Sequence, residues 1–138
     1  MNAEWHLWLD YAEENGRVAD LCFESGLFNA ALQNVQQAVE KTLKALCLAS
    51  GLSVKKTHNI RELLADLQRV GVKLDFVEED IDLLDSIYLP SKYPLGSALP
   101  DFNPDISLAR RCLILMKKIS DEVRKDIRKI ESQIENRK

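Results

Sequence analysis

Four polar side chains recur at helical spacing in the middle of the sequence. Gln37, Glu40, Lys41 and Lys44 stand at i, i+3, i+4 and i+7, so a helix would carry them on one polar stripe. One interpretation is a solvated helix face with local Glu–Lys pairing, and the other is a ligand site whose lysines meet phosphate charge. Under both, replacing Lys41 or Lys44 by Ala is expected to leave the fold intact, and only the second predicts a loss of binding.

A histidine follows two lysines at a predicted helix entry. His58 comes after Lys55, Lys56 and Thr57. An imidazole beside two cations is expected to stay neutral, which suits a hydrogen-bond partner or a general base. The alternative is a histidine that helps to cap the helix. The other histidine, His6, is expected to be exposed, and without an HExxH or Cys/His cluster the sequence predicts no metal and no cofactor.

The segment YLPSKYP (88–94) is the third candidate. Pro90 and Pro94 restrict the backbone on either side of Lys92 and Tyr93. An aromatic ring for stacking and a cation for phosphate would suit a nucleotide, whereas the alternative is that the tyrosines pack on the end of the fold. The sequence has no GxxxxGK[ST] loop, no GxGxxG and no GxSxG, so the common NTPase, dinucleotide and hydrolase signatures are absent.

Helices must position these residues. The 138 residues are 46% hydrophobic and 30% charged, with five Gly and four Pro, too few chain breakers for an all-β fold. Apolar spacing predicts helices over about 2–25, 29–50, 60–69, 75–89 and 105–135. Asn29 and either Thr57 or Asn59 are the predicted caps, and the last helix is expected to start near Pro104 or Asp105. All four prolines fall within 90–104, a long connection. The predicted fold is all-α, an antiparallel up-and-down bundle of four to five helices in a single domain over 1–138.

The last predicted helix is long enough to extend past the others. Ile127, Ile130 and Ile134 continue its apolar spacing and are expected to have no partner within the chain. Apolar residues on such an overhang favour contact with a second chain, which predicts a homodimer.

The cysteines and the charge favour a cytoplasmic protein. Cys22, Cys47 and Cys112 are odd in number and widely spaced, which predicts no disulfide framework. No apolar run reaches the length of a membrane span, the first residues lack a signal-like pattern, and no membrane contact is expected. The net charge of −3 gives no strong nucleic-acid signal.

Three ordered motifs, QQAVEKTLKAL (36–46), THNIREL (57–63) and YLPSKYP (88–94), together resemble the HEPN family, the higher eukaryote and prokaryote nucleotide-binding domain. The resemblance implies a dimeric helix bundle encoded beside a minimal nucleotidyltransferase, often in a toxin–antitoxin module. Seven residues match polar positions of the family and become candidate ligand-binding residues: Gln37, Glu40, Lys41, Lys44, His58, Lys92 and Tyr93.

The resemblance departs from the family pattern at one motif. Ribonuclease members place an Arg before a His with four to six residues between them, but Gly51, Leu52 and Ser53 occupy those positions before His58. The sequence therefore favours a non-catalytic nucleotide-binding or substrate-presenting subunit, with nucleotide or RNA as ligand. The alternatives are an RNase-like toxin that uses His58 in a non-standard site, and a helical adaptor without a ligand.

Overall fold

The computed structural model describes residues 3–87 and 104–137. Within these ranges the chain forms five helices and no strand, which confirms the predicted all-α class. The helices are α1 (Glu4–Glu24), α2 (Phe28–Ala49), α3 (Ile60–Arg69), α4 (Glu78–Ser86) and α6 (Ile106–Glu135).

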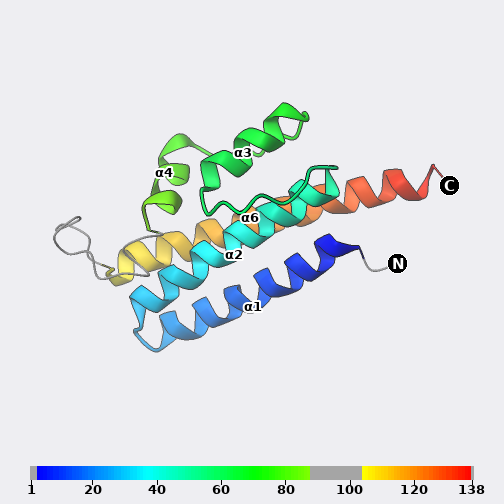
Figure 1. Cartoon of the computed structure of the whole chain (residues 1–138). Coiled ribbons are helices and arrows are strands. Elements are labelled where there is room, and N and C mark those ends of the chain that lie inside the picture. Colours follow the sequence, from blue (N-terminus) through cyan, green and yellow to red (C-terminus); the bar gives the residue numbers. More distant parts are fainter. Residues whose placement is uncertain (1–2, 88–103, 138) are drawn as a thin grey trace.

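Three long helices make the body of the molecule (Figure 1). α1 runs antiparallel to both α2 and α6, so α2 and α6 point the same way; the chain returns between them through α3 and α4. These two short helices lie on the side of α2 and α6 that faces away from α1 (Figure 1). α2 is therefore enclosed, and 14 of its 22 residues are buried, including the alanines Ala31, Ala38 and Ala45.

Glycines end three of the helices as the sequence predicts. Gly26, Gly51 and Gly71 have φ values of 76°, 89° and 84°, a backbone conformation that costs other residues energy. At each end, the amide after the glycine donates to a carbonyl five residues back, as Leu27 N does to Cys22 O at 2.8 Å. This bond satisfies a terminal carbonyl and lets α2 begin two residues after Gly26.

Side-chain caps begin α3 and α6. Asn59 accepts a hydrogen bond from Glu62 N at 2.9 Å, as predicted, and Asp105 accepts one from Leu108 N at 2.9 Å. The predicted cap Asn29 is wrong: α2 begins at Phe28 with Leu27 as its N-cap, because the turn at Gly26 leads straight into the helix. α4 begins at Glu78, later than predicted, and Val77 before it is 61% exposed.

The predicted overhang of the last helix is mostly wrong. Ile127 is 2% exposed and Ile130 packs against the core, whereas Ile134 is 42% exposed. The first turn of α1 reaches this end of α6, where Trp5 Nε1 donates to Glu131 Oε2 at 3.2 Å and His6 Nε2 lies 2.6 Å from the same oxygen. The apolar spacing of α6 is thus satisfied inside the chain almost to its end.

No helix in the described ranges has the length and apolar character needed to cross a bilayer.

Candidate functional site

A carboxylate buried in the middle of α2 is the centre of the candidate site. Glu40 is 4% exposed, and its Oε2 accepts a hydrogen bond from Lys44 Nζ at 2.9 Å. Its other oxygen, Oε1, lies 2.8 Å from His58 Nδ1 and 3.5 Å from Gln36 Nε2. Because Lys44 is itself only 5% exposed, the stripe is not a solvated face, and the pair is a buried ion pair that depends on both partners.

His58 joins this cluster from the connection between α2 and α3. A carboxylate can only accept, so His58 Nδ1 donates to Glu40 and the ring is held in one orientation. Its backbone carbonyl also accepts from Gln36 Nε2 at 3.1 Å, so α2 holds both its main chain and its side chain. The ring nevertheless remains 50% exposed, so the cluster runs from a buried ion pair to an imidazole at the surface.

Lys55, one of the two lysines before His58, pairs with a carboxylate of α3. Its Nζ lies 2.9 Å from Asp66 Oδ2, and the His58 ring contacts the Glu40 carboxylate. The hydrogen bond from Lys55 lowers the pKa of Asp66, with Arg69 contributing less. The Lys55–Asp66 pair fastens the 50–59 connection to α3 and so helps to place His58 above α2.

Two members of the cluster were not among the predicted site residues. Gln36 is 1% exposed and stands at i−4 from Glu40, a spacing that could have identified it. Trp8 of α1 has its ring centroid 5.7 Å from Lys44 Nζ, so an aromatic face lies over the buried ammonium. The Trp8 contact depends on how α1 packs, and the sequence carries no signal for it.

Lys41 points away from the cluster, toward α1. Its Nζ donates to Asn15 Oδ1 at 2.7 Å, Asn15 Nδ2 donates to Asn34 Oδ1 at 3.0 Å, and Asn34 Nδ2 donates to Ala30 O at 3.0 Å. We name this Lys41–Asn15–Asn34 series the interhelix polar chain. Lys41 therefore has a structural contact of its own, with α1.

The remaining predicted residues divide into two cases. Gln37 is half-buried and donates through Nε2 to Gln36 Oε1 at 3.0 Å, which places it one hydrogen bond away from Glu40. Lys92 and Tyr93 lie outside the described residues. The structure thus brings Lys44 and His58 into direct contact with Glu40, and joins Gln37 to Glu40 through Gln36.

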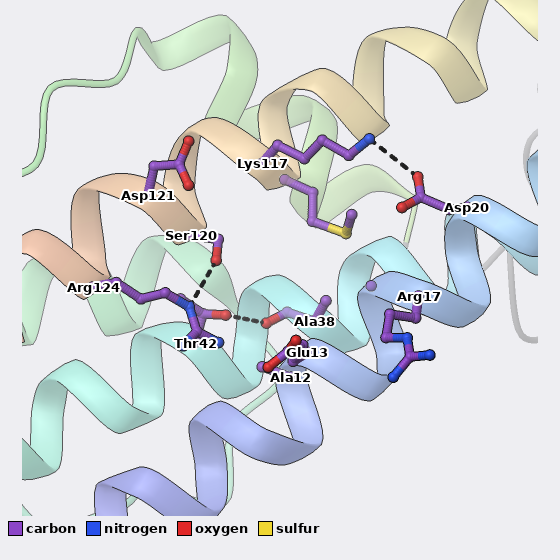
Figure 2. Close-up of a pocket in the computed structure, with 12 residues that line it drawn as sticks. Ala12, Glu13, Arg17, Asp20, Ala38, Thr42, Lys117, Ser120, Asp121 and Arg124 are labelled. Atoms are coloured by element: carbon purple, nitrogen blue, oxygen red, sulfur yellow. Dashed lines mark hydrogen bonds and ion pairs between the residues drawn. The ribbon is translucent and has the colours of Figure 1, made fainter.

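A groove lies between α1 and α6 (Figure 2), with a volume of about 370 Å³. Lys117 pairs with Asp20 across it at 3.2 Å, and Arg124 is held by Ser120 and by the Leu9 carbonyl, so polar contacts brace both ends. Its lining has three basic and three acidic side chains: Arg17, Lys117, Arg124, Glu13, Asp20 and Asp121. This balanced charge favours no phosphate ligand, and no predicted site residue lines the groove.

The buried thiols of Cys47 and Cys112 do not provide a reactive nucleophile. Burial raises the pKa of Cys47 and of Cys112 to about 11, so both stay protonated near neutral pH and make poor nucleophiles. Across residues 3–87 and 104–137, no three His, Cys, Asp or Glu side chains come together in a way that could hold a metal ion. The chemistry that the described residues offer is hydrogen bonding, and proton transfer at an oriented imidazole.

Comparison with known proteins identifies related chains. A model of the HEPN domain matches residues 5–130. The crystal structure of TT1696 from Thermus thermophilus is 34% identical, with a TM-score of 0.75 over 91% of this chain and 98% of that one. The structure of ST0689, described as an archaeal HEPN homologue, is 24% identical, with a TM-score of 0.66 over 91% of this chain and 99% of that one. No curated protein matches the sequence.

Proposed function

The chain belongs to the HEPN domain family, and on that premise we propose that it is a nucleotide-binding or substrate-presenting subunit. It works with a separately encoded minimal nucleotidyltransferase, in a module of the toxin–antitoxin kind. The nucleotide or RNA binds at the exposed side of the Gln36–Glu40–Lys44–His58 cluster. We include in the proposal that the protein is cytoplasmic and forms a homodimer.

One observation carries this proposal: the imidazole of His58 is half exposed and is held by a carboxylate that is itself buried. Preorganised polar groups bind ligands better than mobile ones because less side-chain freedom is lost on binding. Holding a surface histidine through a buried Glu–Lys pair also costs desolvation energy. Such a cost is hard to explain for a histidine that only completes a helix cap, a role that Asn59 already fills.

The cluster divides the work between buried and exposed groups. Lys44 donates to Glu40, so it acts by holding the carboxylate in place rather than by touching phosphate. Glu40 orients His58, and His58 donates to or accepts from the ligand. Gln37 lies beside them, and Lys92 and Tyr93 stay predictions for phosphate contact and base stacking.

The second candidate function is an RNase-like toxin. An oriented histidine is chemically adequate as a general base toward a 2′-hydroxyl, which keeps this alternative in view. We favour the binding role because Gly51, Leu52 and Ser53 stand where ribonuclease members of the family have an Arg. The third alternative, a helical adaptor without a ligand, does not explain why the chain buries the Glu40–Lys44 pair beneath His58.

Calorimetry tests the binding role. The wild-type protein is titrated with ATP, with the other NTPs and with short RNAs, at several salt concentrations and with and without its nucleotidyltransferase. We expect binding that His58→Ala weakens at least tenfold and that His6→Ala, the matched change at the other histidine, leaves unchanged. An absence of binding to every ligand under all conditions would refute the proposal.

A growth assay separates the binding role from the toxin. The isolated gene is expressed as wild type, as His58→Ala and as His6→Ala. Growth arrest that is abolished only by His58→Ala would favour the RNase-like toxin. Unimpaired growth with all three is the result expected for a binding subunit.

A further inference from the structure

One face of α1 carries large apolar side chains that nothing in the described chain covers. Leu7, Tyr11, Val18 and Leu21 are 52%, 58%, 37% and 63% exposed. At 100° per residue they lie opposite Leu9, Ala12 and Ala19, which face the core. Figure 1 agrees, since α1 lies at an edge of the molecule and its other helices are all on one side of it. We call this surface the outer stripe of α1.

The spacing of the outer stripe is that of a surface made for another helix. Together with Glu14, its residues fall at positions 7, 11, 14, 18 and 21, in alternating steps of four and three. From Leu7 to Leu21 the stripe is about 21 Å long, about two heptads. Exposed apolar residues are common singly, but four at this spacing on one helix form a patch of the kind that binds a partner.

Charge specifies what that partner is. α1 has six carboxylates and one guanidinium, a formal charge of −5, and Glu14 is exposed in the middle of the outer stripe. A helix that covers the stripe must therefore place a cation opposite Glu14 and avoid acidic flanks.

A second α1 is a poor match for the same surface. A parallel, in-register pair of α1 helices would bring two Glu14 carboxylates together. It would also bring two helices of charge −5 side by side, which is unfavourable. The homodimer proposed above would have to use another face.

We propose that the outer stripe of α1 binds an amphipathic, basic helix of a different protein, with an apolar seam of about two heptads and a Lys or Arg at its centre. The apolar contacts supply the affinity, and the central cation opposite Glu14 selects the partner and its alignment. This inference does not rest on the nucleotide site, because His58 and the outer stripe belong to different elements of the fold.

Two designed peptides test the inference. Both are 21-residue helices with Leu at seam positions spaced like those of α1 and with Lys-rich flanks; one has Lys and the other Glu at the centre of the seam. Binding is followed by the fluorescence anisotropy of the labelled peptides. We expect the Lys-centred peptide to bind wild type at least tenfold tighter than the Glu-centred one, and we expect Glu14→Lys to reverse that order.

Controls separate the outer stripe from general charge attraction. The double variant Leu7→Ser/Leu21→Ser should bind the Lys-centred peptide at least tenfold more weakly, whereas Ile114→Ser, at a 63% exposed position on α6, should bind as wild type does. His58→Ala should also bind the peptide normally, which keeps a failure here distinct from a failure of the nucleotide site.

Three results would overturn the inference. They are an absence of peptide binding, an order of affinities that Glu14→Lys does not change, and a wild-type dimer in sedimentation that Leu7→Ser/Leu21→Ser dissociates. The last would assign the outer stripe to a second copy of the chain.

Discussion

The buried pair of Glu40 and Lys44 makes a strong prediction about stability. We expect Lys44→Met to lower the free energy of unfolding by about 3 kcal/mol, because it leaves a buried carboxylate without its cation. Methionine keeps the apolar length of lysine beside Trp8, so the loss reports the charge rather than a cavity. Breaking a buried ion pair costs about 3–5 kcal/mol, and we expect the lower value here because the hydrogen bond from His58 still stabilises the Glu40 carboxylate.

Lys41→Met is the matched control. Lys41 is also on α2, but it is half-buried and donates only to Asn15, so we expect a cost of about 1 kcal/mol or less. The sequence alone predicts that replacing either lysine leaves the fold intact. The burial of the pair corrects that expectation, since removing the Lys44 ammonium leaves the Glu40 carboxylate, which is 4% exposed, without its cation.

The assay is urea denaturation at pH 7, followed by the fluorescence of Trp5 and Trp8. The double variant Glu40→Gln/Lys44→Met removes both charges and should cost about 2 kcal/mol less than the two single changes added together. Equal losses for Lys44→Met and Lys41→Met, with unchanged m-values, would refute the argument that Glu40 and Lys44 form a buried pair.

Three further predictions follow from contacts described above. Hydrogen bonding lowers the pKa of Asp66, so its carboxylate stabilises the fold above its ordinary pKa and loses that effect as pH falls. The free energy of unfolding of the wild type should therefore fall more than that of Asp66→Asn between about pH 5 and pH 2. Parallel plots of unfolding free energy against pH for the two proteins would contradict this. At pH 8, Cys47 and Cys112 with pKa values of about 11 are only about one-thousandth thiolate, so Ellman's reagent should modify Cys22 first and the other two at the rate of unfolding. Rapid reaction of all three thiols would show that the two are accessible. Gly16→Ala should raise the free energy of unfolding by about 0.5–1 kcal/mol, because Ala favours a helix more than Gly does and the added Cβ would meet its nearest side-chain atom at an ordinary contact distance of 3.5 Å. A lower urea midpoint would show that the packed helices cannot accommodate the methyl group.

The sequence predicts the helices well because their signals are local. The glycine at position 51 and the cap at Asn59 belong to short segments whose backbone preferences fix where helices end. The end of α6 was predicted less well. The overhang was expected because the last helix is longer than α2. The sequence gives no sign that α1 extends far enough for Trp5 to contact Glu131.

The candidate site was predictable only in part for the same reason. Helical spacing correctly places Glu40 and Lys44 on one side of α2, but their burial depends on Trp8 and on the 50–59 connection, which are distant in sequence. Spacing also groups Lys41 with them, although a difference of one residue turns it by 100° toward α1. Periodicity indicates which residues share a face, and tertiary packing decides what that face meets.

The interhelix polar chain has a consequence for how the chain avoids misfolding. The buried alanines of α2 recur every seven residues, so apolar packing alone would discriminate weakly against a register of α1 on α2 that is shifted by two turns. Such a slip would separate Asn15 from Asn34 and Lys41 and leave their half-buried polar groups without partners. The interhelix polar chain thus fixes the register of the α1–α2 hairpin, much as a single buried asparagine does in a coiled coil. Replacing all three residues by alanine would produce a hairpin with competing registers, visible as doubled amide resonances in NMR spectra.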